Sequence, residues 1–347
     1  MLGLRAHLRD GQVIPAHPLA LTPRRTLDER RQRALTRYYV DAGAGGIAVG
    51  VHTTQFAIRE HALYRPVLEL AAETARTAIA PSPRPFVLVA GVCGTTRQAI
   101  REAAIARNLG YDLALLSLAG LHDMDDRALV RHSRAVSEVL PLFGFYLQPA
   151  VGGRALSHNF WRELCELPSL WAIKVAPFNR YATYDVVRAV IESGRDDVAL
   201  YTGNDDNIVA DLVTPVRVSV GGAVRERWMD GGLLGQWAVW TRRAVELLAT
   251  AKAARTEASV PSSLLAMGAA LTRANGAIFD ADNAFAGCIP GIHEVLRAQG
   301  LMRGVWCLNP REVLSSGQRH AIARVRALYS ELSDDDFVRE HLDRWLS

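Results

Sequence analysis

The chain has 347 residues, of which 49% are apolar and 22% charged, and its 40 basic and 36 acidic side chains give a formal charge of +4. This composition is that of an ordinary globular protein, long enough for one large α/β barrel with an appendage or for two domains. The sequence contains no lysine-rich or arginine-rich block of the kind that contacts a nucleic-acid backbone. No run approaches the roughly 20 uninterrupted apolar residues of a membrane span. Neither nucleic acid nor membrane is therefore an expected partner.

Four cysteines are scattered along the chain without a C-x-x-C pair: Cys93, Cys165, Cys288 and Cys307. This spacing argues against a disulfide framework or a zinc ribbon and favours a reducing compartment. The first residues, MLGLRAHLRDGQVIPAH, carry charges inside their only apolar stretch, unlike a secretion signal. We therefore expect a cytoplasmic protein.

A short apolar run, a polar turn and a longer segment of helical periodicity recur along the chain. The runs are too short for typical helices and indicate parallel strands covered on both faces. The predicted strands are Val13–Ala16, Gly46–Val51, Phe86–Gly91, Leu113–Leu118, Leu142–Leu147, Leu170–Val175, Val198–Thr202 and Val216–Val220. The predicted helices between them include Leu27–Ala42, Tyr64–Ala80, Arg97–Asn108, Arg127–Val139 and Tyr184–Ser193.

Eight such units over roughly 230 residues predict a closed (β/α)₈, or TIM, barrel over residues 1–250. An open doubly wound sheet would usually bring a glycine-rich phosphate loop after the first strand, where this chain has VIPAHPLALT. The eighth unit is the least defined, because VTPVRVSVGGAVRERWMDGGLLGQWAVW holds either one strand or a strand and a hairpin. Strand signals stop near Ala251, so residues 251–347 are predicted to form a C-terminal helical appendage packed on the barrel. Its predicted helices are Ser262–Ala274, Ile292–Gln299 and Arg311–Leu332.

Lys174 is the sharpest chemical signal, because it lies within the apolar run LWAIKVAP of a chain that has few lysines. Side chains at the carboxyl ends of barrel strands converge on one mouth, where active sites are built. A buried ammonium is costly unless it is paired or loses its proton, and an uncharged amine attacks a ketone to form an imine. The alternative is a lysine that reaches solvent or pairs with a carboxylate.

Tyr146 ends the strand before that of Lys174, so the two side chains are expected to be neighbours around the rim. A phenol suits proton transfer, although a packed barrel tyrosine is the alternative. Thr53 and Thr54 follow the second strand and offer hydroxyl and amide donors to a carboxylate, or else form a simple turn.

Four segments, taken in order, resemble the dihydrodipicolinate synthase and N-acetylneuraminate lyase family. They are AGAGGIAVGVHTTQFAIREHALYRPVLELAAETA, FVLVAGVCGTTRQAIREAAIARNLGYDLALLSL, LFGFYLQPAVGGRALSHNFWRELCELPSLWAIKVA and DVALYTGNDDNIV. Each motif alone is weak, whereas the ordered set is specific. The likeness covers roughly residues 13–240 and is consistent with the barrel.

By this resemblance, Lys174 would form an imine with a pyruvate-like 2-oxo acid, and Tyr146 would transfer the proton. Thr53 would relay that proton, and Thr54 would bind the carboxylate of the acid. Gly203, in the turn after the seventh strand, would let the backbone approach the substrate. The resemblance implies no cofactor, no metal and a homo-oligomer, either a dimer or a tetramer.

The chain also departs from the family pattern. The family's G-T-T-G-E motif reads His52-Thr53-Thr54-Gln55-Phe56, and its second relay tyrosine has no counterpart in LLSLAGLHDMD. Arg154 lies near the place of the arginine that grips the second substrate's carboxylate, at a spacing stretched by two glycines. These departures predict a different second substrate.

Two further groups are candidates for the pocket. His52 stands beside the threonine pair, but the histidines form no H-x-x-x-H or H-E-x-x-H pattern, so no metal site is predicted. Asn204, followed by Asp205 and Asp206, either lines the mouth or caps the next helix.

The sequence thus predicts a Schiff-base-forming lyase (an aldolase, synthase or hydro-lyase) that acts on pyruvate or a related 2-oxo acid through Lys174. The alternative from another class is a non-catalytic barrel that binds a 2-oxo acid and has lost turnover, which the missing relay tyrosine favours. A metal-dependent aldolase on the same barrel is a third hypothesis, which histidine ligands would identify.

Overall fold

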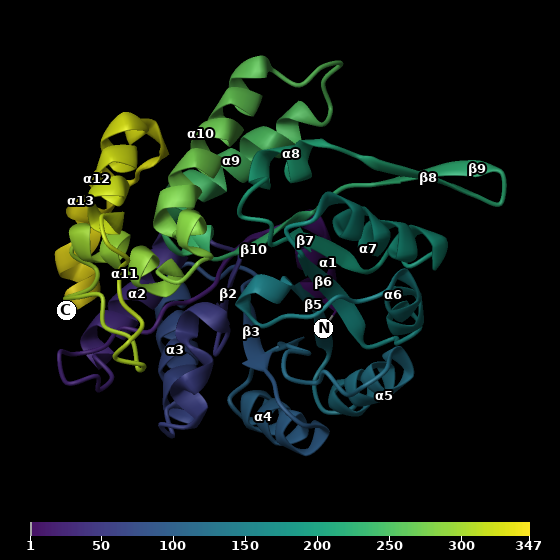
Figure 1. Cartoon of the computed structure of the whole chain (residues 1–347), viewed down its shortest axis with the longest axis horizontal. Helices are drawn as coiled ribbons and strands as arrows, with labels where there is room; N and C mark the ends of the chain where they lie inside the picture. The colour runs from purple at the N-terminus through teal and green to yellow at the C-terminus, as the bar shows by residue number, and fades with distance from the viewer. Residues whose placement is uncertain (1) are drawn as a thin grey trace.

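The computed structural model describes residues 2–347, and eight parallel strands form its centre (Figure 1). The strands are β1 (Val13–Pro15), β2 (Gly46–Val49), β3 (Val87–Val92), β4 (Leu113–Leu116), β5 (Leu142–Leu147), β6 (Leu170–Ala176), β7 (Ala199–Thr202) and β10 (Gly231–Leu234). They pair in the order β1-β10-β7-β6-β5-β4-β3-β2. A parallel bridge between Ala16 and Ala48 joins β1 to β2 and closes the ring. The predicted (β/α)₈ barrel is confirmed.

Helices surround this ring. They are α2 (Glu29–Asp41), α3 (Tyr64–Ile79), α4 (Thr96–Asn108), α5 (Asp126–Ser137), α6 (His158–Cys165), α7 (Arg180–Glu192), α8 (Ile208–Val213) and α9 (Thr241–Ala254). Five of them begin at a side chain that accepts a backbone N–H of the first turn, as N-caps do: Asp28, Thr95, Asp125, Ser157 and Asn179. A further helix, α1 (Leu2–Asp10), which the sequence pattern did not reveal, places Leu8 in the barrel interior.

The prediction that Val216–Val220 is the eighth barrel strand is wrong, and the alternative of a strand and a hairpin in this segment is confirmed. Val216–Val220 forms β8, which pairs antiparallel with β9 (Ala223–Arg227) in a hairpin that projects away from the barrel beside α7 (Figure 1). Gly221 and Gly222 make its turn with positive φ angles of 59° and 83°. The alternation of valine with polar residues in VRVSV is that of a half-exposed strand, which is the signal that distinguishes it from the buried barrel strands.

The true eighth strand is β10, which lies between β1 and β7. Its sequence, GGLL, has little strand propensity because it begins with two glycines. The structure needs glycine there, since a Cβ on Gly231 would lie 2.4 Å from the carbonyl oxygen of Gln12. The close approach of the N-terminal segment therefore requires glycines that lower the strand propensity of this segment, and strand propensity alone does not predict β10.

The strands alternate between two apolar cores. One core fills the barrel, with Phe143, Phe145, Ala172 and Ala176 among its members. The other lies between strands and helices and takes the intervening residues of the same strands, such as Ile173. Because side chains alternate along a strand, a shift of one residue moves a side chain from one core to the other.

The C-terminal region is helical, as predicted: α10 (Ser262–Ile278), α11 (Cys288–Ala298), α12 (Gln318–Leu328) and α13 (Asp335–Leu346). Asp334 fixes it to the barrel helices by accepting hydrogen bonds from the Tyr38 hydroxyl at 2.7 Å and the Arg242 amide at 3.0 Å. The division into residues 1–250 and 251–347 stays a prediction, and α9 runs through residue 250. Among residues 2–347, no helix combines the length and apolar character that crossing a bilayer requires.

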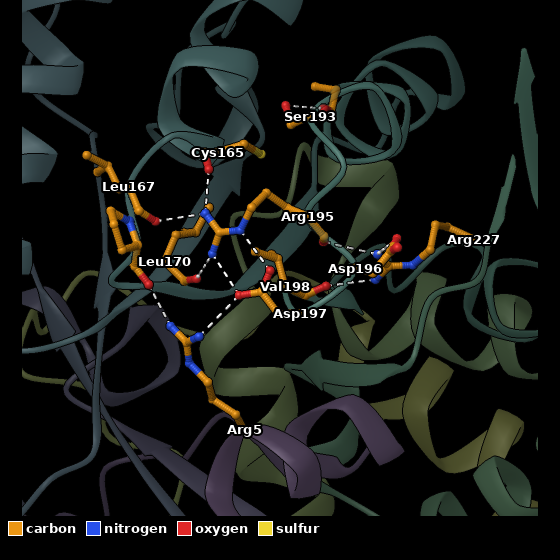
Figure 2. A network of polar contacts seen from close by, with 12 residues as sticks. Arg5, Cys165, Leu167, Leu170, Ser193, Arg195, Asp196, Asp197, Val198 and Arg227 are labelled. Carbon is orange, nitrogen blue, oxygen red and sulfur yellow. Dashed lines mark hydrogen bonds and ion pairs between the residues drawn. The ribbon is translucent and has the colours of Figure 1, made fainter. Parts of the chain in front are cut away.

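A polar network ties the amino-terminal ends of β6 and β7 together (Figure 2). The Arg195 guanidinium donates to the carbonyl oxygens of Cys165, Leu167 and Leu170 and pairs with Asp197 at 2.7 Å. Arg5 of α1 reaches the same carboxylate at 3.1 Å. The side chain of Arg195 is only 18% exposed. Its removal would therefore leave several carbonyl groups without a hydrogen-bond donor in a place that water reaches poorly.

We expect Arg195→Ala to destabilise the fold by about 2–4 kcal/mol, because hydrogen bonds to a charged donor contribute about 1.5–3 kcal/mol each and water replaces only part of them. Urea denaturation measures this change. The control is Arg188→Ala on α7, whose side chain is 45% exposed and should cost under about 1 kcal/mol. Equal effects from the two variants would show that the network contributes no special stability.

Candidate active site

A cavity of about 60 Å³ lies at the carboxyl ends of the barrel strands, where TIM-barrel active sites are found. That is room for several water molecules, since one needs roughly 10–15 Å³ by this measure. Its walls come from the barrel strands, the loops after them and the C-terminal region: Ala16, Val51, His52, Thr53, Phe145, Leu147, Gln148, Val151, Lys174, Ala176, Phe178, Gly203, Asp205, Gly235, Phe279, Phe285, Cys288 and Ile292.

Lys174 lies on the inner face of β6 and points into this cavity. Its neighbours Ile173 and Val175 belong to the outer core, whereas Ala172 and Ala176 share its inner face. The residue is 8% exposed, and its Nζ sits 4.6 Å from the centre of the Phe145 ring. Burial lowers the pKa of Lys174 to about 8, and the negative charge of Asp205 opposes that shift. The amine is thus held in a wall where losing its proton is easy.

Phe145, and not Tyr146, is the aromatic residue that faces Lys174, which corrects the expected geometry. Phe145 is paired with Lys174 across β5 and β6, while Tyr146 is paired with Val175. Tyr146 therefore points into the outer core, where its ring lies 5.5 Å from that of Trp161. Its hydroxyl accepts the Leu156 amide at 3.2 Å. The structure does not bring this phenol into the cavity, because consecutive strand residues face opposite sides.

The threonine pair forms a short 3₁₀ turn, η1 (His52–Thr54), after β2. Thr53 lines the cavity, but its hydroxyl donates to the Ala16 carbonyl at 2.8 Å. The Thr54 hydroxyl donates to the His17 carbonyl at 2.6 Å and accepts the Gly50 amide at 3.0 Å, and Thr54 is not part of the cavity wall. In this structure both hydroxyls hold the β1–β2 edge of the barrel together.

His52 does line the cavity, as predicted from its position. Burial, and secondarily the charge of Lys174, lower the pKa of His52 to about 4, so its imidazole is neutral near pH 7. A neutral ring offers one donor and one acceptor nitrogen to a substrate.

Gly203 follows β7 and lies against the side chain of Lys174. The space there admits only a residue without a side chain. A Cβ added to Gly203 would stand 2.7 Å from Cε of Lys174 and 2.7 Å from Cβ of Ala176. Glycine at this position therefore lets the two strands close around the amine without a clash.

Two predicted substrate-binding residues lie behind the cavity wall. Asn204 is fully buried, and its side chain donates to Asp211 at 2.9 Å and accepts the Phe178 amide at 3.0 Å. It thereby shapes the loop that carries Phe178. Arg154 donates to the Leu121 carbonyl and is not part of the wall. Both predictions located the right loops but gave the side chains roles that their contacts do not show.

The sequence reasoning missed the C-terminal part of the wall. Phe279, Phe285 and Ile292 come from the end of α10 to α11, more than 100 positions after Lys174. Phe178 adopts a positive φ of 51° and its ring meets that of Phe285 edge-to-face at 6.0 Å. No local pattern announces such residues, because packing of the appendage on the barrel brings them to the mouth. Among residues 2–347, no three His, Cys, Asp or Glu side chains gather as metal ligands would.

These features define a barrel with a buried, readily deprotonated lysine at its mouth. The model of the dihydrodipicolinate synthetase family matches residues 11–223, and the chain belongs to this family. Members of the family are lyases of the class I aldolase type.

Two relatives are identical to this chain at about a quarter of the aligned positions. The 4-hydroxy-tetrahydrodipicolinate synthase of Cyanothece sp. is 27% identical over 56% of this chain and 64% of its own length. The N-acetylneuraminate lyase of Citrobacter koseri is 26% identical over 59% of this chain and 67% of its own length. The sequence match thus spans about two thirds of each relative.

Solved structures show the same fold over nearly their whole length. YagE of E. coli K12, a protein of this family in complex with pyruvate, has a TM-score of 0.72 at 18% identity, covering 92% of this chain and 97% of that one. The dihydrodipicolinate synthase of Acinetobacter baumannii complexed with pyruvate has a TM-score of 0.72 at 19% identity, covering 90% and 97%. At this identity the likeness shows the fold alone.

We expect Gly203→Ala to destabilise the fold by about 1–3 kcal/mol, because the added methyl overpacks the contact with Lys174. The control is Gly276→Ala on α10, where a Cβ meets nothing within 4 Å and a helical alanine should stabilise by up to about 1 kcal/mol. Denaturant titration of the three proteins measures both changes. A Gly203→Ala protein as stable as the unaltered chain would contradict the close packing described for Lys174.

Proposed function

We propose that this chain is a Schiff-base-forming lyase that acts on pyruvate or a related 2-oxo acid through Lys174. The observation that carries the proposal is the position of the amine, which is buried and points into a cavity at the barrel mouth. A lysine with a pKa of about 8 is neutral in about a tenth of molecules near pH 7, far more than an ordinary lysine with a pKa of about 10.4. Only the neutral amine attacks a ketone carbon.

The family supports the choice of acid, since two structural neighbours are described in complex with pyruvate. His52, with its neutral ring, Thr53 and Gln148 are uncharged polar residues of the cavity wall that can offer hydrogen-bond donors to a carboxylate. By the same family relation we expect a homo-oligomer, either a dimer or a tetramer.

The apolar part of the cavity lining favours an apolar second substrate. It includes Leu147, Val151, Phe178, Phe279 and Phe285, and no arginine lines the cavity among the residues described. A second substrate with its own carboxylate would lack a cationic partner there and would lose hydration on binding. We therefore expect an aldehyde that carries an apolar or aromatic group.

The alternative function is a barrel that binds a 2-oxo acid without turnover. It is favoured by one observation, namely that Phe145 occupies the place opposite Lys174 where a phenol was expected. The two functions differ in the chemical steps after imine formation, so they are separable by experiment.

Borohydride trapping tests the proposal directly. The chain has two lysines, Lys174 and Lys252, and Lys252 instead donates to the Gly11 carbonyl at 2.8 Å, outside the cavity. After incubation with pyruvate and borohydride, we expect mass spectrometry to find the reduced pyruvyl adduct on Lys174. Lys252→Met should trap as well as the unaltered chain, and Lys174→Met should not trap.

The outcome that contradicts the proposal is a folded protein that forms no adduct on Lys174 with pyruvate, 2-oxobutyrate or a 2-oxo acid with an aromatic side chain. Equal labelling of Lys174 and Lys252 would contradict it too, because it would show adventitious imine formation at any accessible amine.

The pH dependence of trapping gives a second prediction. The rate should rise as the ammonium of Lys174 loses its proton, with a midpoint near the pKa of about 8, and level off above it. The physical reason is that burial disfavours the charged form. Initial trapping rates between pH 6 and about 10.5, the usual pKa of a lysine, measure this. A midpoint at that upper value would show that the amine is solvated like a surface lysine.

A further inference from the structure

The proposed chemistry needs a group that moves protons beside the imine, and the described residues put no tyrosine in the cavity wall. Tyr146 is turned into the outer core, and Phe145 has no hydroxyl. The side chains in the wall that exchange protons, apart from Lys174, are His52, Asp205 and Cys288. One of these must act if the site turns over.

The surroundings of the three groups distinguish them. Burial and the nearby carboxylates raise the pKa of Cys288 far above its usual value, so it stays a neutral thiol. Burial lowers the pKa of His52 to about 4, so almost none of its imidazole is in the protonated form that could act as an acid at pH 7. Burial raises the pKa of Asp205 to about 7, where both its acid and its base form are populated.

Asp205 is also fixed in place by contacts from two other parts of the chain. It lies in the turn after β7, two residues beyond the Gly203 that packs on the lysine side chain. Its Oδ1 accepts the Gln236 amide of η4 (Gln236–Ala238) at 2.9 Å. Its carbonyl oxygen accepts the Asn275 side chain of α10 at 2.7 Å. Within residues 2–347 its Oδ2 makes no hydrogen bond, so this oxygen is available to a ligand in the cavity.

We propose that Asp205 is the catalytic acid and base of this site, in place of the phenol that β5 turns away from Lys174. The inference rests on the proposed function, because it assigns a role within the reaction of Lys174 with a 2-oxo acid. The carboxyl and the amine line the same small cavity, from neighbouring strands β6 and β7.

A single carboxyl group can balance the protons. The neutral Lys174 amine adds to C2 of the 2-oxo acid, and a proton moves from nitrogen to the new alkoxide to give a carbinolamine. Asp205 in its acid form protonates that hydroxyl, which leaves as water while the nitrogen lone pair forms the iminium. The resulting carboxylate removes a proton from C3, and the C–H electron pair forms the enamine double bond as the C=N pair returns to nitrogen.

Carbon–carbon bond formation closes the cycle. The enamine C3 attacks the aldehyde carbon, and the aldehyde oxygen takes the proton that Asp205 carries. Asp205, now a carboxylate, takes a proton from the water that attacks C2 of the new iminium. The carbinolamine hydroxyl then passes its proton to nitrogen, and the C–N bond breaks to release the product and the neutral Lys174 amine, with Asp205 back in its acid form. Asp205 alternates between its acid and carboxylate forms from one step to the next. A pKa of about 7 keeps both forms accessible near neutral pH.

The test monitors C3–H removal by proton NMR, as loss of the pyruvate methyl signal in deuterium oxide. We expect the unaltered chain to exchange these protons and Asp205→Asn to exchange them at least about 100-fold more slowly, since a positioned acid–base group contributes about 10²–10⁴-fold. Asparagine keeps an oxygen for the Gln236 amide. The matched control is Asp206→Asn, an exposed neighbour outside the wall, which should exchange within about twofold of the unaltered rate.

Borohydride trapping of the same variants gives a second measurement, the pH midpoint of adduct formation. This midpoint would not shift if Asp205 only supported the fold. Asp205→Asn should still form the adduct on Lys174, but more slowly, because the acid that expels water is lost. The pH midpoint of trapping should also move below that of the unaltered chain, because the charge of Asp205 raises the pKa of Lys174. The titratable groups around Lys174 and Asp205 are His52 of η1 and Cys288 of α11, which line the cavity, and Asp206, which lies outside the wall in the same loop and acts through its charge. Asp205→Asn leaves all three in place.

The outcomes separate this inference from the proposed function. If Asp205→Asn traps on Lys174 and also exchanges at the unaltered rate, the role of Asp205 is overturned while the Schiff-base function stands. If the unaltered chain traps pyruvate and exchanges no protons, Asp205 has no such role and the site is a binding barrel. If Asp205→Asn does not fold, Asp205→Ser, which keeps an acceptor for Gln236, takes its place with the same expected slowing.

Discussion

A charged amine cannot be left in an apolar barrel wall without a counter-ion or a loss of its proton, and the architecture of this protein is organised around Lys174 in that position. The side chain has apolar neighbours on both sides of it along β6, a phenyl ring opposite and a glycine behind it. The charge of Asp205 raises the pKa of Lys174, but among residues 2–347 no ion pair joins the two side chains within 4 Å. The amine therefore stays reactive, because a direct salt bridge would hold its proton in place.

The burial that acts on the amine also makes its neighbours unusual. A carboxyl and an imidazole that share the cavity titrate far from their ordinary values, which is how acid–base groups are commonly tuned. The C-terminal helices matter here as well, since Phe279 and Phe285 cover the mouth and Asn275 holds the loop of Asp205. The appendage is therefore part of the site, and it supplies the low-dielectric cover on which the pKa shifts depend.

Family membership and site chemistry agree on the lysine and differ on the proton carrier. Residues 11–223 match the dihydrodipicolinate synthetase family, and the barrel superposes on its solved members. Within that frame, β5 presents Phe145 to the cavity and turns Tyr146 toward Trp161. A tyrosine at the expected sequence position is thus no guarantee of a phenol in the site. The face of the strand decides which side chain reaches the substrate, and that face is a property of pairing with β6.

The amino-acid sequence by itself determined the repeated βα pattern, the first seven strands, the helical C-terminal region and the lysine within an apolar strand, because hydrophobic periodicity and residue rarity are local properties. Only the tertiary structure decided that GGLL closes the barrel while VRVSV leaves it. It also decided that Tyr146 faces outward, and that Asp205 and Phe285 join Lys174 at one cavity. These outcomes depend on strand register, on close backbone approach and on contacts between residues far apart in the chain. No window of sequence contains that information.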